Sequence, residues 1–137
     1  MALILDTGPL FAAMDRSDVD HDSCAALVED AKEPIIVPAP VLVEIDWLAG
    51  RRLRPDSFLS LLLDIEEARL RVEDLRQTDY ARARELVDRY RDLPLGFVDA
   101  AVLSIVERLG EPKLATLDHR HFTVVRPRHV PTLRLLP

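Results

Sequence analysis

The sequence predicts an α/β fold in which helices cover both faces of a central parallel sheet, giving three layers. Two observations predict it. Short, wholly apolar segments alternate with longer helical segments along the chain, which is the pattern of parallel strands joined by helical crossovers. The strand segments also lack the polar–apolar alternation of a sheet with one face in water. We therefore expect a single domain over residues 1–137.

The individual elements follow from local signals in chain order. The first apolar run ends at an acid and leads through Gly8-Pro9 into a helix. Asp20 suits an N-cap, Pro40 suits the first turn of a helix that Gly50 ends, and Gly110 suits the end of a later one. The expected strands are 2–5, 35–37, 70–72, 114–116 and 133–136, and the expected helices are the one after Pro9, then 21–31, 40–49, 55–67, 78–90 and 97–109.

The composition is that of a globular domain, with 48% hydrophobic and 31% charged residues. The single cysteine, Cys24, excludes an internal disulfide and suits a reducing compartment. The chain opens directly on its first apolar run, without a leader, and its apolar stretches are shorter than the roughly 20 residues of a membrane span. We expect a cytoplasmic protein.

The net charge of −6 argues against a broadly basic surface for nucleic acid. Nearly all of the positive charge is arginine, the side chain best suited to pair with phosphate. We expect the arginines of residues 82–91 to coat a solvated helix, whereas the other groups leave open a basic rim around an acidic site. The arginine groups are Arg51, Arg52 and Arg54; Arg82, Arg84, Arg89 and Arg91; and Arg120, Arg126 and Arg128.

Two acids, Asp6 and Asp118, each follow an apolar strand closely, one near each end of the chain. Ligands of open α/β sheets gather beyond the carboxyl ends of the strands. If the two strands are neighbours, the two carboxylates meet there. Taken alone, either acid is equally suited to a turn or a helix cap.

Two further acids lie within the apolar stripes of helices. Glu44 shares its stripe with Val41 and Ile45, and Asp99 shares its stripe with Val106. We expect both carboxylates to point toward the core, where an unpaired charge costs several kcal/mol. Neither stripe contains a lysine or arginine, so the expected partner is a cation. Asp46 lies on another helical face and is expected to be solvated.

Oxygen ligands favour Mg²⁺ or Mn²⁺, whereas zinc favours histidine or cysteine. The histidines show no ligand spacing with the acids. We expect His119 and His121 to face solvent or to hold a loop.

Four segments containing these acids resemble the PIN domain, and specifically the VapC-type toxins of toxin–antitoxin pairs. They occur in the family's order, and the resemblance covers essentially the whole chain. The segments are Ile4-Leu5-Asp6-Thr7 with Pro9-Leu10, Val43-Glu44-Ile45-Asp46-Trp47-Leu48, Phe97-Val98-Asp99-Ala100-Ala101, and Ala115-Thr116-Leu117-Asp118-His119-Arg120-His121-Phe122.

The resemblance implies a three-layer α/β/α PIN-like fold and an endoribonuclease that leaves a 5′-phosphate. Its acidic set maps onto Asp6, Glu44, Asp99 and Asp118 as catalytic and metal-binding residues. The hydroxyl residues that support such a site match Thr7 and Thr116. Gly8 replaces a common Ser or Asn, and His121 replaces a frequent Asp, which puts a fifth acidic contribution in doubt.

Metal chemistry suggests the roles of these acids. One or two Mg²⁺ or Mn²⁺ ions lower the pKa of a bound water and neutralise charge on the phosphate. Asp6 and Asp99 are the expected direct ligands. Glu44 and Asp118 are expected to ligate directly, to act through water, or to orient the attacking water.

The resemblance also implies partners: an RNA substrate and a VapB-type antitoxin whose tail blocks the site. The leucine-rich helix expected over 55–67 has more apolar surface than one core face requires. This surplus suits a homodimer or an antitoxin groove, and a fully buried helix is an equal alternative.

Other functional classes fit less well. A receiver-like phosphoacceptor domain needs a lysine after a late strand, but Lys113 precedes its strand. A catalytically inactive PIN-fold interaction module would not need the full acidic set. A DNA-directed nuclease of related fold usually carries insertions for which this chain has no room.

Overall fold

The computed structural model describes all residues from Met1 to Pro137. Its strands are all parallel and form two hydrogen-bonded groups, β1-β2-β3 and β4-β5. A bridge from Leu5 to Ala115 joins β1 to β4, so the strand order across the molecule is β3-β2-β1-β4-β5. The strands are β1 Leu3–Ile4, β2 Ile35–Pro38, β3 Arg71–Glu73, β4 Lys113–Ala115 and β5 Arg134–Leu136.

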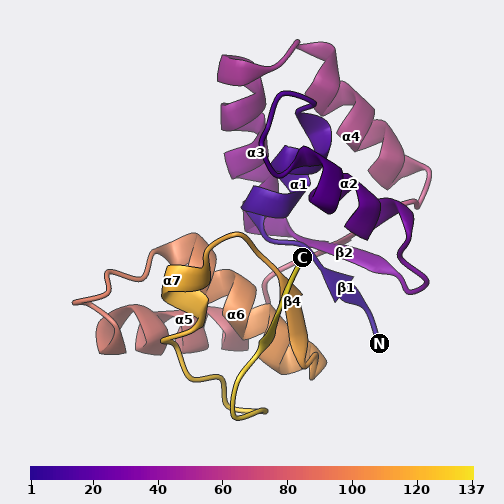
Figure 1. The fold of residues 1–137 in the computed structure, drawn as a ribbon. Coiled ribbons are helices and arrows are strands. Elements are labelled where there is room, and N and C mark those ends of the chain that lie inside the picture. The colour runs from indigo at the N-terminus through magenta and orange to yellow at the C-terminus, as the bar shows by residue number, and fades with distance from the viewer.

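Helices connect successive strands and cover both sides of the sheet. Figure 1 shows α1 to α4 on one side of the strands, and α5 and α6 on the other. The predicted α/β architecture with a parallel sheet between helical layers is therefore confirmed. The helices are α1 Thr7–Met14, α2 His21–Glu29, α3 Ala39–Arg52, α4 Asp56–Glu66, α5 Gln77–Arg89, α6 Phe97–Leu109 and α7 His119–Phe122.

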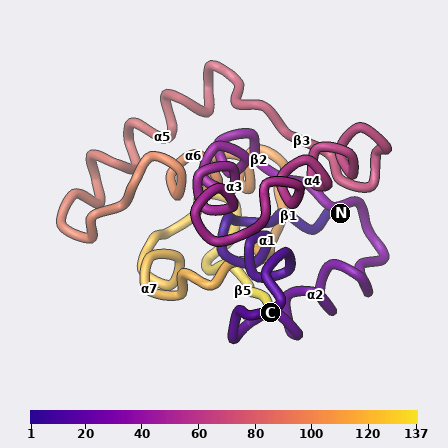
Figure 2. Tube along the Cα trace, turned by 90° about the horizontal axis from the view of Figure 1, so that it is seen from above, coloured from indigo at the N-terminus to yellow at the C-terminus, as the bar shows by residue number.

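The central strands and helix α6 supply the core. Ile4, Leu5 and Ile36 are buried in the sheet, and Val102 and Val106 are buried on α6. Figure 2 shows α1, α3 and α6 gathered near the centre of the molecule, with α2 and α5 at opposite margins. Helices α1 and α3 begin just after the carboxyl ends of β1 and β2, and α6 precedes β4.

Most predicted boundaries agree with the structure to within two residues, but α3 does not end at Gly50. It continues to Arg52, because Gly50 does not adopt the positive φ that would end a helix. A Cβ added at Gly50 would meet no other atom. Gly110 does end α6, with φ of 68°, the left-handed conformation that glycine adopts at helix C-termini. Asp20 precedes α2 as predicted, although its side chain makes no capping hydrogen bond.

Arginines of α5 and α6 join these two helices by ion pairs. Arg82 pairs with Glu107 through two hydrogen bonds, of 2.8 Å and 2.9 Å. Arg108 contacts Asp79 and, at 2.8 Å, Glu73. The expectation that the arginines of residues 82–91 simply coat a solvated helix is therefore wrong for Arg82, because its guanidinium is largely buried between two helices.

No helix of the structure is both long enough and apolar enough to cross a membrane.

Candidate metal centre at the carboxyl edge of the sheet

Asp6 lies where β1 and β4 meet. Its backbone N–H donates to Ala115 O at 2.9 Å, which continues the pairing begun by the bridge between the strands. The Asp6 side chain caps α1 by accepting from Thr7 N at 2.8 Å, and its other oxygen accepts from Thr116 Oγ1 at 2.8 Å. Asp6 is 5% exposed and Thr116 is fully buried. The predicted meeting of the two strand ends is therefore found in the fold.

Thr116 links Asp6 to Asp118. Its hydroxyl oxygen accepts from Asp118 N at 3.0 Å while its proton is donated to Asp6. One threonine hydroxyl therefore contacts both the side chain of Asp6 and the backbone N–H of Asp118. These are the two acids that were predicted to meet if β1 and β4 were neighbours.

Glu44 reaches the same edge from α3. Thr7 Oγ1 donates to Glu44 Oε1 at 2.5 Å, so the residue after Asp6 fixes the carboxylate of the neighbouring helix. The expectation that Glu44 points into the core is wrong, because the side chain is exposed, as are its neighbours Val43 and Trp47. Glu44 lies at the side of the apolar stripe of α3, whose residues Val41, Ile45 and Ala49 are buried. Asp46 is exposed, as predicted.

Asp99 lies in the first turn of α6 and is half-buried, so it turns only partly toward the core. One of its carboxylate oxygens, one of Asp118, and one ring nitrogen of His121 all lie within 4.8 Å of one another. This is the closest grouping of potential metal ligands in the structure, and it contains two of the predicted acids.

His121 joins the site through Asp118. The first Asp118 oxygen accepts from His121 N at 3.0 Å, and the second lies 2.6 Å from His121 Nδ1. His121 Nε2 is buried and has no hydrogen-bond partner. The His121 side chain does not face solvent, and its contacts with Asp118 hold the segment that leads into α7, the second of the two expected roles, whereas His119 is exposed as expected.

The site is electrostatically unbalanced. Burial raises the pKa of Asp6 to about 6, and the charges of Asp99 and Glu44 add to this effect. Burial also raises the pKa of Asp99, with further contributions from Asp118 and Glu44. These mutual repulsions indicate that the four predicted acids share one field.

No lysine or arginine compensates this field, and the basic group beside it is the imidazole of His121, which contacts Asp118. None of the ion pairs made by lysine or arginine involves Asp6, Glu44, Asp99 or Asp118. Clustered carboxylates without a counter-charge form the oxygen-rich donor set that hard divalent cations take. The residues present therefore fit a divalent metal ion.

The residue pattern did not predict the contact between His121 and Asp118. The resemblance marked position 121 as one where an Asp is frequent, and His121 lies three residues after Asp118, the N-cap of a short helix. That helix, α7, spans just His119–Phe122, too short to show apolar periodicity.

Comparisons with known proteins agree with this geometry. A family model described as the PIN domain matches residues 3–126. The chain is 27% identical over 125 residues to Ribonuclease VapC26 of Mycobacterium tuberculosis (strain ATCC 25618 / H37Rv), covering 91% of this chain and 93% of the relative. The predicted resemblance to PIN domains and VapC-type toxins is thereby confirmed.

Two solved structures share the fold. The crystal structure of Mycobacterium tuberculosis VapC20, a toxin that cleaves the Sarcin-Ricin loop, superimposes with a TM-score of 0.75 at 20% identity, covering 82% of this chain and 86% of that one. The structure of VapBC2 from Rickettsia felis, bound to a DNA fragment from its promoter, gives a TM-score of 0.64 at 19% identity, covering 98% and 97%.

Proposed function

Because the chain belongs to the PIN-domain family and is a homologue of a VapC ribonuclease, we propose that it is a metal-dependent endoribonuclease and the toxin of a toxin–antitoxin pair. The observation that carries this proposal is the cluster of uncompensated acids at the carboxyl edge of the sheet. Nucleases of the PIN family depend on metal, and the cluster is the part of this fold that can hold it.

Mg²⁺ or Mn²⁺ is the proposed cofactor because the donors are mainly carboxylate oxygens. Asp6 and Asp99 are the proposed direct ligands. Their raised pKa values mean that a bound cation relieves repulsion as it binds. When bound, the ion lowers the pKa of a water and neutralises charge on the phosphodiester.

The remaining residues hold the reacting groups in place. Thr116 positions Asp6, and Thr7 positions Glu44, through the hydrogen bonds described above. Glu44 is exposed to solvent, from which RNA would approach. It is therefore suited to orient the attacking water or to bind the ion at the solvent-facing side of the cluster. Asp118 is proposed to ligate directly or through water. The product strand would carry a 5′-phosphate, with no covalent protein intermediate.

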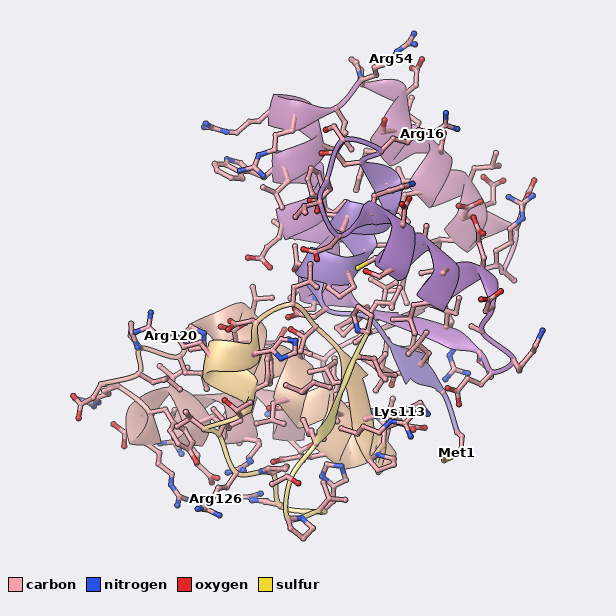
Figure 3. The ribbon with its side chains drawn as sticks, viewed as in Figure 1. Met1, Arg16, Arg54, Lys113, Arg120 and Arg126 are labelled. Carbon is pink, nitrogen blue, oxygen red and sulfur yellow. The ribbon has the colours of Figure 1, made fainter.

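Arginines at the surface are the proposed contacts for the RNA backbone. Arg51, Arg52 and Arg54 are exposed at the end of α3, and Arg120 is exposed on α7 next to Asp118. Figure 3 shows Arg54 and Arg120 extending from separate parts of the molecule, one beyond α3 and one beside α7. A strand of RNA lying across the acids would meet positive charge on both sides.

The proposed protein partners are a second copy of the chain and a VapB-type antitoxin. Helix α4 exposes Leu59, Leu62 and Leu63 and buries only Leu61 fully, so the alternative of a fully buried α4 is wrong. We propose that this leucine face forms the homodimer. The antitoxin tail is proposed to neutralise the carboxylates with a basic side chain. We place the protein in the cytoplasm, where such an RNA substrate is found.

Incubation of purified protein with total RNA and transfer RNA tests this function. We expect discrete fragments in Mg²⁺ or Mn²⁺ from the wild type and from Asp46→Asn, whose side chain is exposed outside the cluster. EDTA should abolish cleavage, and Asp99→Asn should reduce it by at least about 100-fold, since a charged ligand is lost. Cleavage that persists in EDTA or in Asp99→Asn would contradict the proposal, as would a wild type that cuts no RNA.

A further inference from the structure

Among the histidines, His121 alone lies within ligand distance of the acidic cluster. His119 is exposed, His21 Nδ1 contacts the carbonyl of Ala12, and His129 Nε2 contacts the carbonyl of Glu111. His121, in contrast, brings a ring nitrogen within 4.8 Å of oxygens of both Asp99 and Asp118.

The ring of His121 is oriented by Asp118. Nδ1 lies 2.6 Å from Asp118 Oδ2, and the backbone N–H of His121 donates to Asp118 Oδ1. If Nδ1 carries the ring proton, the lone pair is on Nε2. Histidines that bind metals typically donate their other ring N–H to a carboxylate, which fixes the tautomer and the ring orientation. The 2.6 Å between His121 Nδ1 and Asp118 Oδ2 is the distance that this arrangement requires.

The second nitrogen supplies an independent observation. Nε2 is buried and makes no hydrogen bond, although the His121 side chain retains 18% exposure. A buried polar atom without a partner is destabilising, so such an atom calls for an explanation such as an ion. Because one ring nitrogen of His121 lies within 4.8 Å of oxygens of Asp99 and Asp118, an ion held by these acids and the imidazole is one such explanation.

We propose that His121 is a metal ligand, so that this site combines carboxylate oxygens with one imidazole nitrogen. The proposal rests on the proposed function, because it assumes that the acids hold a divalent cation. Its consequence is selectivity. Mg²⁺ prefers oxygen donors and is held reluctantly by nitrogen, whereas transition ions gain affinity from imidazole. The protein should therefore favour Mn²⁺ over Mg²⁺ more strongly than an all-carboxylate site does.

Pulsed electron paramagnetic resonance of the Mn²⁺-loaded protein tests the ligand directly, without any reference to RNA cleavage. The wild type should show the ¹⁴N coupling of a directly bound imidazole. His119→Asn is the matched control, because it removes an exposed histidine two positions away, and it should keep the coupling. His121→Asn should lose it and should bind Mn²⁺ about 10-fold to 100-fold more weakly.

A second variant, His121→Asp, provides an all-oxygen site and guards against a failure of His121→Asn to fold. It should lose the ¹⁴N coupling and bind Mg²⁺ at least as tightly as the wild type, so that the preference for Mn²⁺ falls about 10-fold or more. Thermal unfolding of both apo variants checks that the fold is retained.

The outcomes separate this inference from the function on which it rests. Mn²⁺ bound to the wild type without ¹⁴N coupling would overturn the role of His121 as a ligand, leaving it as a residue that orients Asp118, while the carboxylate site stands. Mn²⁺ that fails to bind the wild type, or that binds Asp99→Asn equally well, would overturn both.

Discussion

At the scale of single residues, the site depends on threonine hydroxyl groups that fix the positions of carboxylates by hydrogen bonds. Thr116 bonds to Asp6 and to the backbone of Asp118, and Thr7 bonds to Glu44. Both threonines were assigned to the site by the resemblance to PIN domains, in which hydroxyl residues support the acids. The structure adds the physical reason: each hydroxyl donates to a carboxylate from a segment far away in the chain and so holds two distant segments together.

The sequence predicted the identities of the acids better than their surroundings. Apolar spacing placed Glu44 on the stripe of α3, but spacing defines the centre of a stripe and not its width. Ile45 and Ala49, which follow Glu44 on the helix, are buried, so Glu44 is exposed because it lies at the side of the stripe. The contact of His121 with Asp118 was not predicted for a related reason, since four residues of α7 give no periodicity from which a face can be read.

The buried carboxylate of Asp6 should make the metal-free protein less stable as the pH rises. Its pKa is raised from 3.8 to about 6, so the folded state binds the proton more tightly than the unfolded state. The free energy of unfolding therefore falls between about pH 4 and pH 6 and levels off above, by about 3 kcal/mol in all.

Urea unfolding in EDTA at pH 5 and pH 8 measures this effect. Between these values the wild type should lose about 1–1.5 kcal/mol more than Asp6→Asn, whose side chain cannot ionise. The comparison between the two proteins cancels the titration of other groups. Equal pH dependence in the two would show that Asp6 is not the strained acid that its burial implies.

At the scale of elements, the predicted end of a helix agrees with the structure where the backbone needs a particular conformation there. Gly110 adopts a positive φ and ends α6 where predicted, whereas Gly50 has no such requirement and α3 passes through it. A glycine near the end of a helical pattern therefore does not by itself predict the end of the helix. The sequence does not show whether the glycine adopts a positive φ or simply lies on an open surface.

Alanine substitutions at the two glycines should have opposite effects. Gly110→Ala places a Cβ in the left-handed conformation and should lower the free energy of unfolding by about 1 kcal/mol. Gly50→Ala lies in open space within a helix and should raise it by up to about 1 kcal/mol. Chemical denaturation of both variants checks the pair, and a loss of stability in Gly50→Ala would mean that its helical assignment is wrong.

At the scale of the whole molecule, the parallel sheet explains how distant segments form one site. Strands β1 and β4 are far apart in sequence but are joined by the Leu5–Ala115 bridge, and this pairing brings Asp6 toward Asp118. The alternation of apolar strands and helices was enough to predict a parallel sheet. This alternation does not specify the order of the strands, because strand order depends on long-range pairing. The adjacency of β1 and β4 therefore could not be predicted from the sequence.

The exposed leucines of α4 should govern self-association. Leu59 and Leu63 are 61% and 47% exposed and lie four residues apart on one helical face. The double variant Leu59→Glu with Leu63→Glu should sediment as a monomer if the wild type is a dimer through this face, with little change in unfolding temperature. Val124→Glu, at an exposed position outside the helix, is the control and should leave the wild-type state unchanged. A dimer that survives the double variant would place the interface elsewhere.

Calorimetric titration of Mn²⁺ into the metal-free protein measures whether the carboxylate cluster holds a divalent cation. We expect saturable binding to the wild type and to Asp46→Asn, and affinity at least about 10-fold weaker for Asp99→Asn, because one charged ligand is lost. Binding that is absent from the wild type, or equally tight in Asp99→Asn, would contradict the claim.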